Sequence, residues 1–405
     1  MAPQPVSFPS CKHAKKPAGP PSGLMWLASE PFRLFFLSGA IWSIIGVSLW
    51  PLFYGGKLPF YPAIPHARIM IETFGGAFVV GFLGTAGPRM ASAPKLTVLE
   101  LGILFAFHTA NGIGHLKGMT GPADLCFVAM LCVLLIGLLA RIIRFRGEPP
   151  PPQLLLALTG LLCGMAGALM MQMDTVLARL AAYRLAGLLL YQGLLLPPVM
   201  GIGAFLFPRI LGGGFGEAGT PEGRRSHAFR AAAAAVLLVA SFFLEGSGAV
   251  LPGYLLRSGT AAAYLLRGIP WRRKAGDPQR GTLARGLFWA MGLGLAGLVA
   301  AGLFPLNRVS MEHLLYIGGF GLLVLVAGSR VLFGHSGELV GFNRRWWMPR
   351  LILLLAVLAA STRASAAIKP EIMISHHNYA AWLWGAAALL WTVWHARRFA
   401  RRDES

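Results

Sequence analysis

Apolar runs of about twenty residues recur along this whole chain, and they constrain its fold more than any other feature. A helix needs about 20 such residues to cross the hydrocarbon core of a bilayer, where every backbone polar group must be satisfied within the segment. The chain is 56% hydrophobic and 13% charged, whereas soluble domains carry about 25% charged residues. We therefore predict an all-α, polytopic membrane helix bundle. Its spans, about twelve in number, are expected at residues 34–54, 69–88, 96–115, 122–140, 153–173, 184–207, 229–246, 248–266, 286–305, 311–333, 350–367 and 378–397.

The lysines and arginines indicate which loops share a side of the membrane. Most of the 36 basic residues flank apolar runs, and they concentrate in alternate loops together with both ends of the chain. Because cytoplasmic loops carry the excess of basic residues, we predict that both termini are cytoplasmic. The predicted organisation is a tail (residues 1–31), one transmembrane domain (32–397) and a second tail (398–405). The net charge of +21 is therefore assigned to lipid headgroups rather than to nucleic acid.

The histidines gather at one depth of the predicted bundle. The chain has ten histidines, and six of them lie at or near the outer ends of four predicted spans. Neutral imidazole suits iron and copper, and helix bundles place such ligands on facing helices. A single interfacial histidine is commonly satisfied by water or a carbonyl, so the gathering is what favours a haem or copper site. The six are His66, His108, His115, His313, His376 and His377; His335 falls on the inner side.

A few other side chains carry weaker signals. The thioethers of Met170, Met171 and Met173 suit Cu(I), although interfacial packing explains them equally simply. Glu72 and Glu245 are carboxylates near the outer level, where an intramembrane acid indicates a proton path or an ion pair. The four cysteines form neither a disulfide framework nor a Cys-x-x-Cys motif.

Several segments, in order along the chain, resemble the NnrS family of haem- and copper-containing membrane proteins linked to nitric oxide. The segment at 31–36 (PFRLFF) is similar to the opening motif of that family, and the segment at 329–337 (SRVLFGHSG) to its Arg-Val-x-x-Gly-His-x-Gly motif. The segments at 65–70 (PHARIM) and 81–88 (GFLGTAGP) are similar to two further family motifs at the same spacing. Arg68 and Ile69 stand where the family has its second histidine and a glutamate. Either that site is altered in this chain, or another histidine such as His115 or His377 takes its place.

The resemblance implies a bacterial inner-membrane protein with haem, expected to be b-type, and with copper as a second candidate cofactor. It implies a role in the nitric oxide response or in denitrification, with nitric oxide as a small gaseous ligand and with an electron donor that the sequence does not identify. The first candidate ligands of haem or copper are His66, His313 and His115. His108, His376 and His377 come next, and His335 matches a family motif from the inner side.

Two other functions remain open from the sequence. A proton-coupled twelve-helix secondary transporter would use Glu72 or Glu245 as its proton-carrying group. A membrane assembly factor would need no cofactor. Even within the metalloprotein hypothesis, a haem-dependent redox enzyme and a protein that only binds nitric oxide would use the same ligands.

Overall fold

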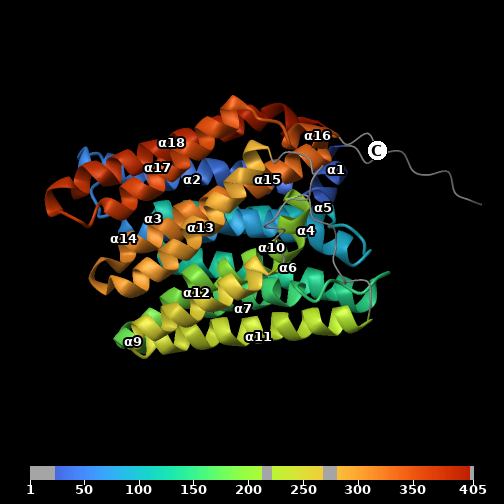
Figure 1. Cartoon of the computed structure of the whole chain (residues 1–405), viewed down its shortest axis with the longest axis horizontal. Helices are drawn as coiled ribbons and strands as arrows, with labels where there is room; N and C mark the ends of the chain where they lie inside the picture. Colours follow the sequence, from blue (N-terminus) through green and yellow to red (C-terminus); the bar gives the residue numbers. More distant parts are fainter. Residues whose placement is uncertain (1–22, 212–220, 268–280, 402–405) are drawn as a thin grey trace, which may run out of the picture.

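The computed structural model describes residues 23–211, 221–267 and 281–401. These residues form an all-α membrane bundle, as predicted, whose long helices run roughly along the longest axis of the molecule (Figure 1). The first 22 residues of the predicted N-terminal tail and the last four of the C-terminal tail lie outside the described residues.

The elements follow one another along the chain with short connections. Their bounds are α1 (Gly23–Ser29), α2 (Phe32–Tyr54), α3 (Ala63–Arg68), η1 (Ile69–Gly75), α4 (Gly76–Met90), α5 (Val98–Leu116), α6 (Thr120–Arg144), α7 (Leu154–Met170), α8 (Asp174–Leu177), α9 (Leu180–Leu188), η2 (Leu189–Gly193), α10 (Leu196–Ile210), α11 (Pro221–Gly246), α12 (Val250–Leu266), α13 (Thr282–Leu303), η3 (Pro305–Asn307), α14 (Arg308–His313), η4 (Leu314–Gly321), α15 (Leu322–His335), α16 (Leu339–Phe342), α17 (Trp347–Ser365) and α18 (Pro370–Ala400).

Eight helices among the described residues are long and apolar enough to cross a bilayer. Each of the twelve predicted spans overlaps a helix or a continuous stack of helical segments. Helices such as α7, with 17 residues, are shorter than the about 20 residues expected of a full span. The number of twelve spans and the cytoplasmic placement of the termini therefore stay predictions.

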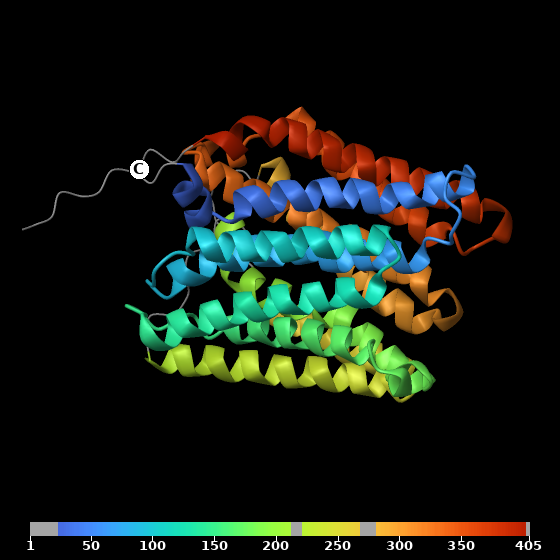
Figure 2. The same cartoon turned by 180° about the vertical axis from the view of Figure 1, so that it is seen from behind.

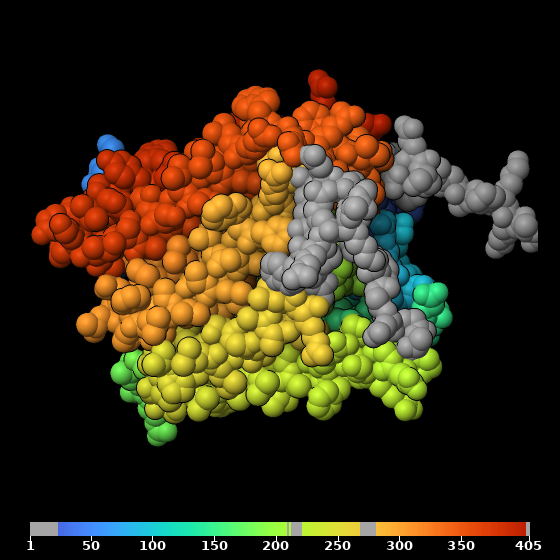
Figure 3. Space-filling view, viewed as in Figure 1, coloured from blue at the N-terminus to red at the C-terminus, as the bar shows by residue number. Residues whose placement is uncertain are grey.

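The outer faces of the peripheral helices are apolar. On α11 the side chains of Phe229 and Val236 are 76% and 67% exposed, and on α18 those of Trp382 and Val393 are 66% and 64% exposed. Figure 3 shows α11 and α12 along one edge of the molecule and α17 and α18 along the opposite edge. Exposed apolar residues in such density indicate surfaces that face lipid.

Helices from the two ends of the chain pack against each other. At one edge, α17 packs against α18 and α18 against α2; at the opposite edge, α11 pairs with α12 and lies near α7. Figure 2 shows the N-terminal helices α2, α4 and α5 between these edges. The first and last helices of the bundle are thus neighbours.

Three rods of consecutive helical segments, which we call helical stacks, each contain a π-helical turn. These turns are η1 between α3 and α4, η2 between α9 and α10, and η4 between α14 and α15. Each packs against a glycine of another helix. A Cβ on Gly167 would lie 2.5 Å from the amide nitrogen of Leu190 in η2, and one on Gly297 would lie 2.5 Å from that of Leu315 in η4. A Cβ on Gly46 would lie 2.9 Å from the side-chain sulfur of Met70 in η1. Small residues let helix backbones approach closely, and π-helical turns are frequent at functional sites.

A buried ion-pair network ties the first helices to the last. Glu30, between α1 and α2, lies 2.5 Å from Nε of Arg33 and 2.8 Å from Nδ1 of His335. Arg33 also donates to the backbone oxygen of Arg398 at 2.7 Å. Burial acts to raise the pKa of Glu30, but the hydrogen bonds and charges of His335 and Arg33 outweigh it and lower the pKa from 4.5 to about 2.

Replacing Glu30 by Gln is expected to destabilise the protein by about 3 kcal/mol at pH 7, because Arg33 and His335 lose a buried partner. Since the pKa of Glu30 is depressed, its contribution is complete above pH 4.5 and is lost as the pH falls toward 2. Thermal unfolding in detergent should therefore show a smaller difference between the variant and the unaltered protein at pH 3 than at pH 7. Glu148→Gln, at an exposed carboxylate, is the matched control, and an equal loss of stability in both variants would contradict this role.

Candidate functional site

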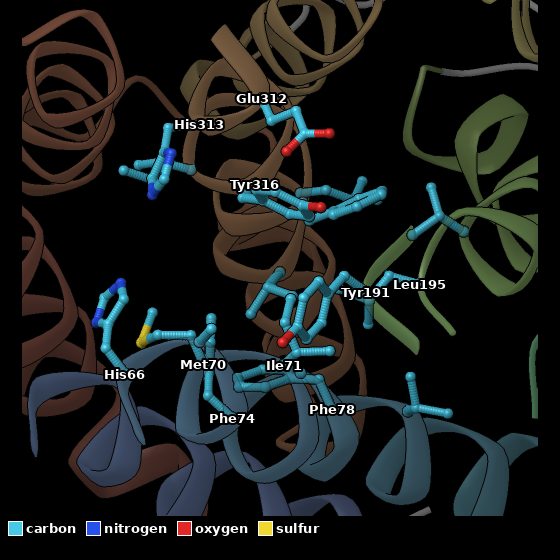
Figure 4. A pocket seen from close by; sticks show the side chains of 18 of the residues that line it. His66, Met70, Ile71, Phe74, Phe78, Tyr191, Leu195, Glu312, His313 and Tyr316 are labelled. Atoms are coloured by element: carbon cyan, nitrogen blue, oxygen red, sulfur yellow. The ribbon is translucent and has the colours of Figure 1, made fainter. Parts of the chain in front are cut away.

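A cavity of about 510 Å³ opens between the three stacks that contain π-helical turns. Its walls include Met70 and Phe74 of η1, Tyr191 of η2, and Tyr316 and Phe320 of η4. Most of its lining is apolar or aromatic, and Figure 4 shows several of these side chains around the open space. Sites for small molecules or cofactors typically have a volume of about 300 to 1,000 Å³ and a few polar groups among apolar walls. This cavity has both properties.

Three histidines from three different helices line one end of this cavity, which we call the histidine end. His66 comes from α3, His313 from α14 and His377 from α18. The indole ring of Trp50 contacts two of the imidazole rings, with its centroid 5.9 Å from that of His66 and 5.0 Å from that of His377. In Figure 4, His66 and His313 lie on the same side of the cavity, opposite Tyr191 and Leu195.

The Nδ1 atom of each of these histidines is already engaged. In His66 it lies 2.9 Å from the backbone oxygen of Gly46, and in His313 it lies 2.6 Å from that of Val309. A carbonyl only accepts hydrogen bonds, so both Nδ1 atoms carry a proton and the neutral rings keep a lone pair on Nε2. In His377, Nδ1 lies 2.9 Å from the hydroxyl of Tyr54. A fixed Nδ1 with a free Nε2 is the usual arrangement of a metal-ligating histidine.

A second set of polar side chains also lines the cavity. They are Glu245, Glu312 and Arg308. Glu312 accepts a short hydrogen bond from the hydroxyl of Tyr254 and another from Gln192 at 3.0 Å. Glu245 pairs with Nη2 of Arg257 at 2.8 Å and with Nη1 of Arg308 at 3.3 Å. Sequence reasoning missed Glu312, although an acidic residue directly before His313 in an apolar run was a usable signal.

The remaining candidate histidines do not line the cavity. His108 lies 2.8 Å from the hydroxyl of Ser38, and Nδ1 of His376 lies 2.9 Å from the backbone oxygen of Ile372. His335 belongs to the Glu30 network described above. His115 is fully buried in a separate polar cluster. The structure thus brings together His66, His313 and His377, and the ligand role of every candidate stays a prediction.

The cluster around His115 contains two carboxylates and an arginine. Nε2 of His115 lies 3.0 Å from Glu72 and 3.7 Å from Asp124. Potential metal-ligand atoms of these three residues lie within 4.8 Å of one another, so the set could hold a metal ion. Arg68, however, already places its guanidinium 3.3 Å from each carboxylate. Two carboxyl groups therefore share one built-in guanidinium in a buried site.

This architecture defines a polytopic membrane protein with a histidine-lined internal cavity. The chain belongs to the NnrS family: the family model described as NnrS protein matches residues 26–402, nearly the whole chain. The membership predicted from the short motifs is thereby confirmed. No curated protein matches the chain.

Replacing Arg68 by Met should strongly destabilise the protein, by about 3 to 5 kcal/mol, because Glu72 and Asp124 would remain buried without their shared cation. The thermal midpoint in detergent and the yield of monodisperse protein measure this effect. Arg179→Gln, at an exposed arginine, is the matched control.

A second substitution tests the same explanation. Adding Asp124→Asn to Arg68→Met removes one of the two carboxylates, and His115 can then pair with the other. The double variant should recover part of the lost stability. If it is no more stable than Arg68→Met alone, repulsion between the carboxylates is not the cause.

Proposed function

We propose that this protein is a haem-binding membrane protein of the NnrS family that binds nitric oxide in its internal cavity. The observation that supports the proposal most directly is the histidine end, where three imidazoles from separate helices meet. Backbone carbonyls hold Nδ1 of His66 and of His313 and leave the Nε2 lone pairs of these two rings available. His66 and His313 are the first candidates to hold the metal, one of them at a time, and His377 is the third candidate.

The residues around the cavity fit a large, flat, mostly apolar group. Phe74, Phe78, Phe320 and Trp384 offer aromatic faces to it, and aromatic side chains contribute large contact areas. Haem iron supplies one coordination position for a gas when a single histidine holds it. Copper is the second candidate, because imidazole nitrogen suits it as well.

The cavity also suits a small uncharged ligand. Nitric oxide is apolar enough to enter from lipid, and the cavity presents mainly hydrocarbon and aromatic surface. Tyr191 and Tyr316 line the same space and offer hydroxyl groups that can orient a bound gas. We propose a role in the nitric oxide response or in denitrification at the bacterial inner membrane, with both termini in the cytoplasm.

The transporter hypothesis has less support from the side chains it depends on. Glu72 is held by Arg68 and His115, and Glu245 is held by Arg257 and Arg308. A proton-carrying carboxylate has to exchange its proton during the cycle, whereas these two are fixed in ion pairs. We therefore favour the metalloprotein.

The test is the absorption spectrum and metal content of the protein purified in mild detergent. We expect a Soret band that shifts when nitric oxide is added. His66→Ala and His313→Ala should each bleach or displace that band and lower the affinity for haem by about 10-fold or more, since even second-shell changes at metal sites cost about 10- to 100-fold.

His376→Ala is a matched control, because His376 is adjacent to His377 in sequence but does not line the cavity. Its spectrum should equal that of the unaltered protein. The absence of a Soret band, of iron and of copper from the unaltered protein would overturn the proposed function, and unchanged spectra in both His66→Ala and His313→Ala would reject these ligands.

A further inference from the structure

Arg363 is a cation at the histidine end of the cavity, and no described residue gives it an acidic partner. It lies in the last turn of α17 and lines the cavity together with His66, His313 and His377. It is close enough to all three histidines to interact with them electrostatically. Its Nη1 donates to the hydroxyl of Ser310 at 2.9 Å, and no carboxylate lies within ion-pair distance of it in the described part of the chain.

Three other arginines are neutralised within the chain. Arg68 pairs with Glu72 and Asp124, and Arg257 pairs with Glu245. Arg308, which also lines the cavity, pairs with Glu245 as well. Arg363 differs from these three, because its hydrogen-bond partner among the described residues is the neutral hydroxyl of Ser310.

Arg363 is half-buried, and an unpaired charge there is unfavourable, because the group loses part of its hydration without gaining a counter-charge. The three neighbouring histidines offer no negative charge. A guanidinium presents a rigid, planar set of N–H donors that matches a carboxylate with two parallel hydrogen bonds. The missing partner of Arg363 is therefore an anion that enters with the occupant of the cavity.

We propose that Arg363 pairs with a carboxylate side chain at the edge of the porphyrin held at the histidine end. This inference rests on the proposed function, since it takes haem as the occupant. It assigns Arg363 as a binding residue that fixes the orientation of the porphyrin relative to His66 and His313, and Ser310 as the residue that holds the guanidinium in place.

The experiment compares haem with its dimethyl ester, which has the same ring and iron but no free carboxylates. Full-length protein prepared without haem is titrated in detergent with each compound, and the Soret band reports binding. We expect the unaltered protein to bind haem about 10-fold more tightly than the ester, a difference of about 1.4 kcal/mol. Arg363→Gln should lose that preference and bind both compounds with similar, weaker affinity.

Three variants serve as controls. Arg308→Gln removes the cavity arginine that already has a partner, so the preference for free carboxylates should remain. Ser310→Ala keeps the charge at position 363 and should retain most of the preference. Arg363→Lys keeps a positive charge without the bidentate geometry, and its preference should be intermediate.

The outcomes separate this inference from the proposed function. If the unaltered protein binds neither compound, the proposed function fails and this inference fails with it. If haem and ester bind equally well to the unaltered protein, or if Arg363→Gln keeps the full preference, haem binding stands and the pairing with Arg363 is wrong. Because the unaltered protein gives a result on its own, the test does not depend on the folding of any variant.

Discussion

The neutralisation of buried charge is the constraint on which the rest of this structure depends. A charge away from water is tolerated only when a counter-charge and hydrogen bonds replace its hydration. Arg68 lies between Glu72 and Asp124, and Arg257 holds Glu245. These pairs join residues that are far apart in sequence, such as Arg68 and Asp124, and thereby fix which helices are neighbours. They also leave the cavity between the helices with mainly neutral, apolar walls.

Departures from regular α-helix create that cavity. Each π-helical turn inserts one residue into a helix and widens it locally, and all three turns contribute to the cavity lining. The glycines that contact them, Gly46, Gly167 and Gly297, let the widened turns pack without pushing the helices apart. The open space therefore arises from backbone geometry in several helices at once, rather than from a few small side chains.

The sequence predicted the helices well and the site in part. Apolar runs indicate where a helix lies, so every predicted span overlaps one. The histidines singled out from the sequence include His66, His313 and His377, which line the cavity together. A hydropathy pattern does not say which face of a helix meets which neighbour. His376 and His377 differ by one position, or about 100° around the helix, and only His377 lines the cavity. The same limit hid Arg363, which lies near the end of the predicted span at residues 350–367.

The hydrogen bonds from His66 and His313 to backbone carbonyls have a consequence for how this site tolerates change. The acceptors are the main-chain oxygens of Gly46 and Val309, and a main-chain oxygen is present whatever residue occupies the position. The tautomer of each imidazole is thus independent of the neighbouring side chains. A substitution of Val309 that preserves the helix leaves the orienting acceptor in place. The tautomers of His66 and His313 can therefore stay the same when residues around the site are substituted.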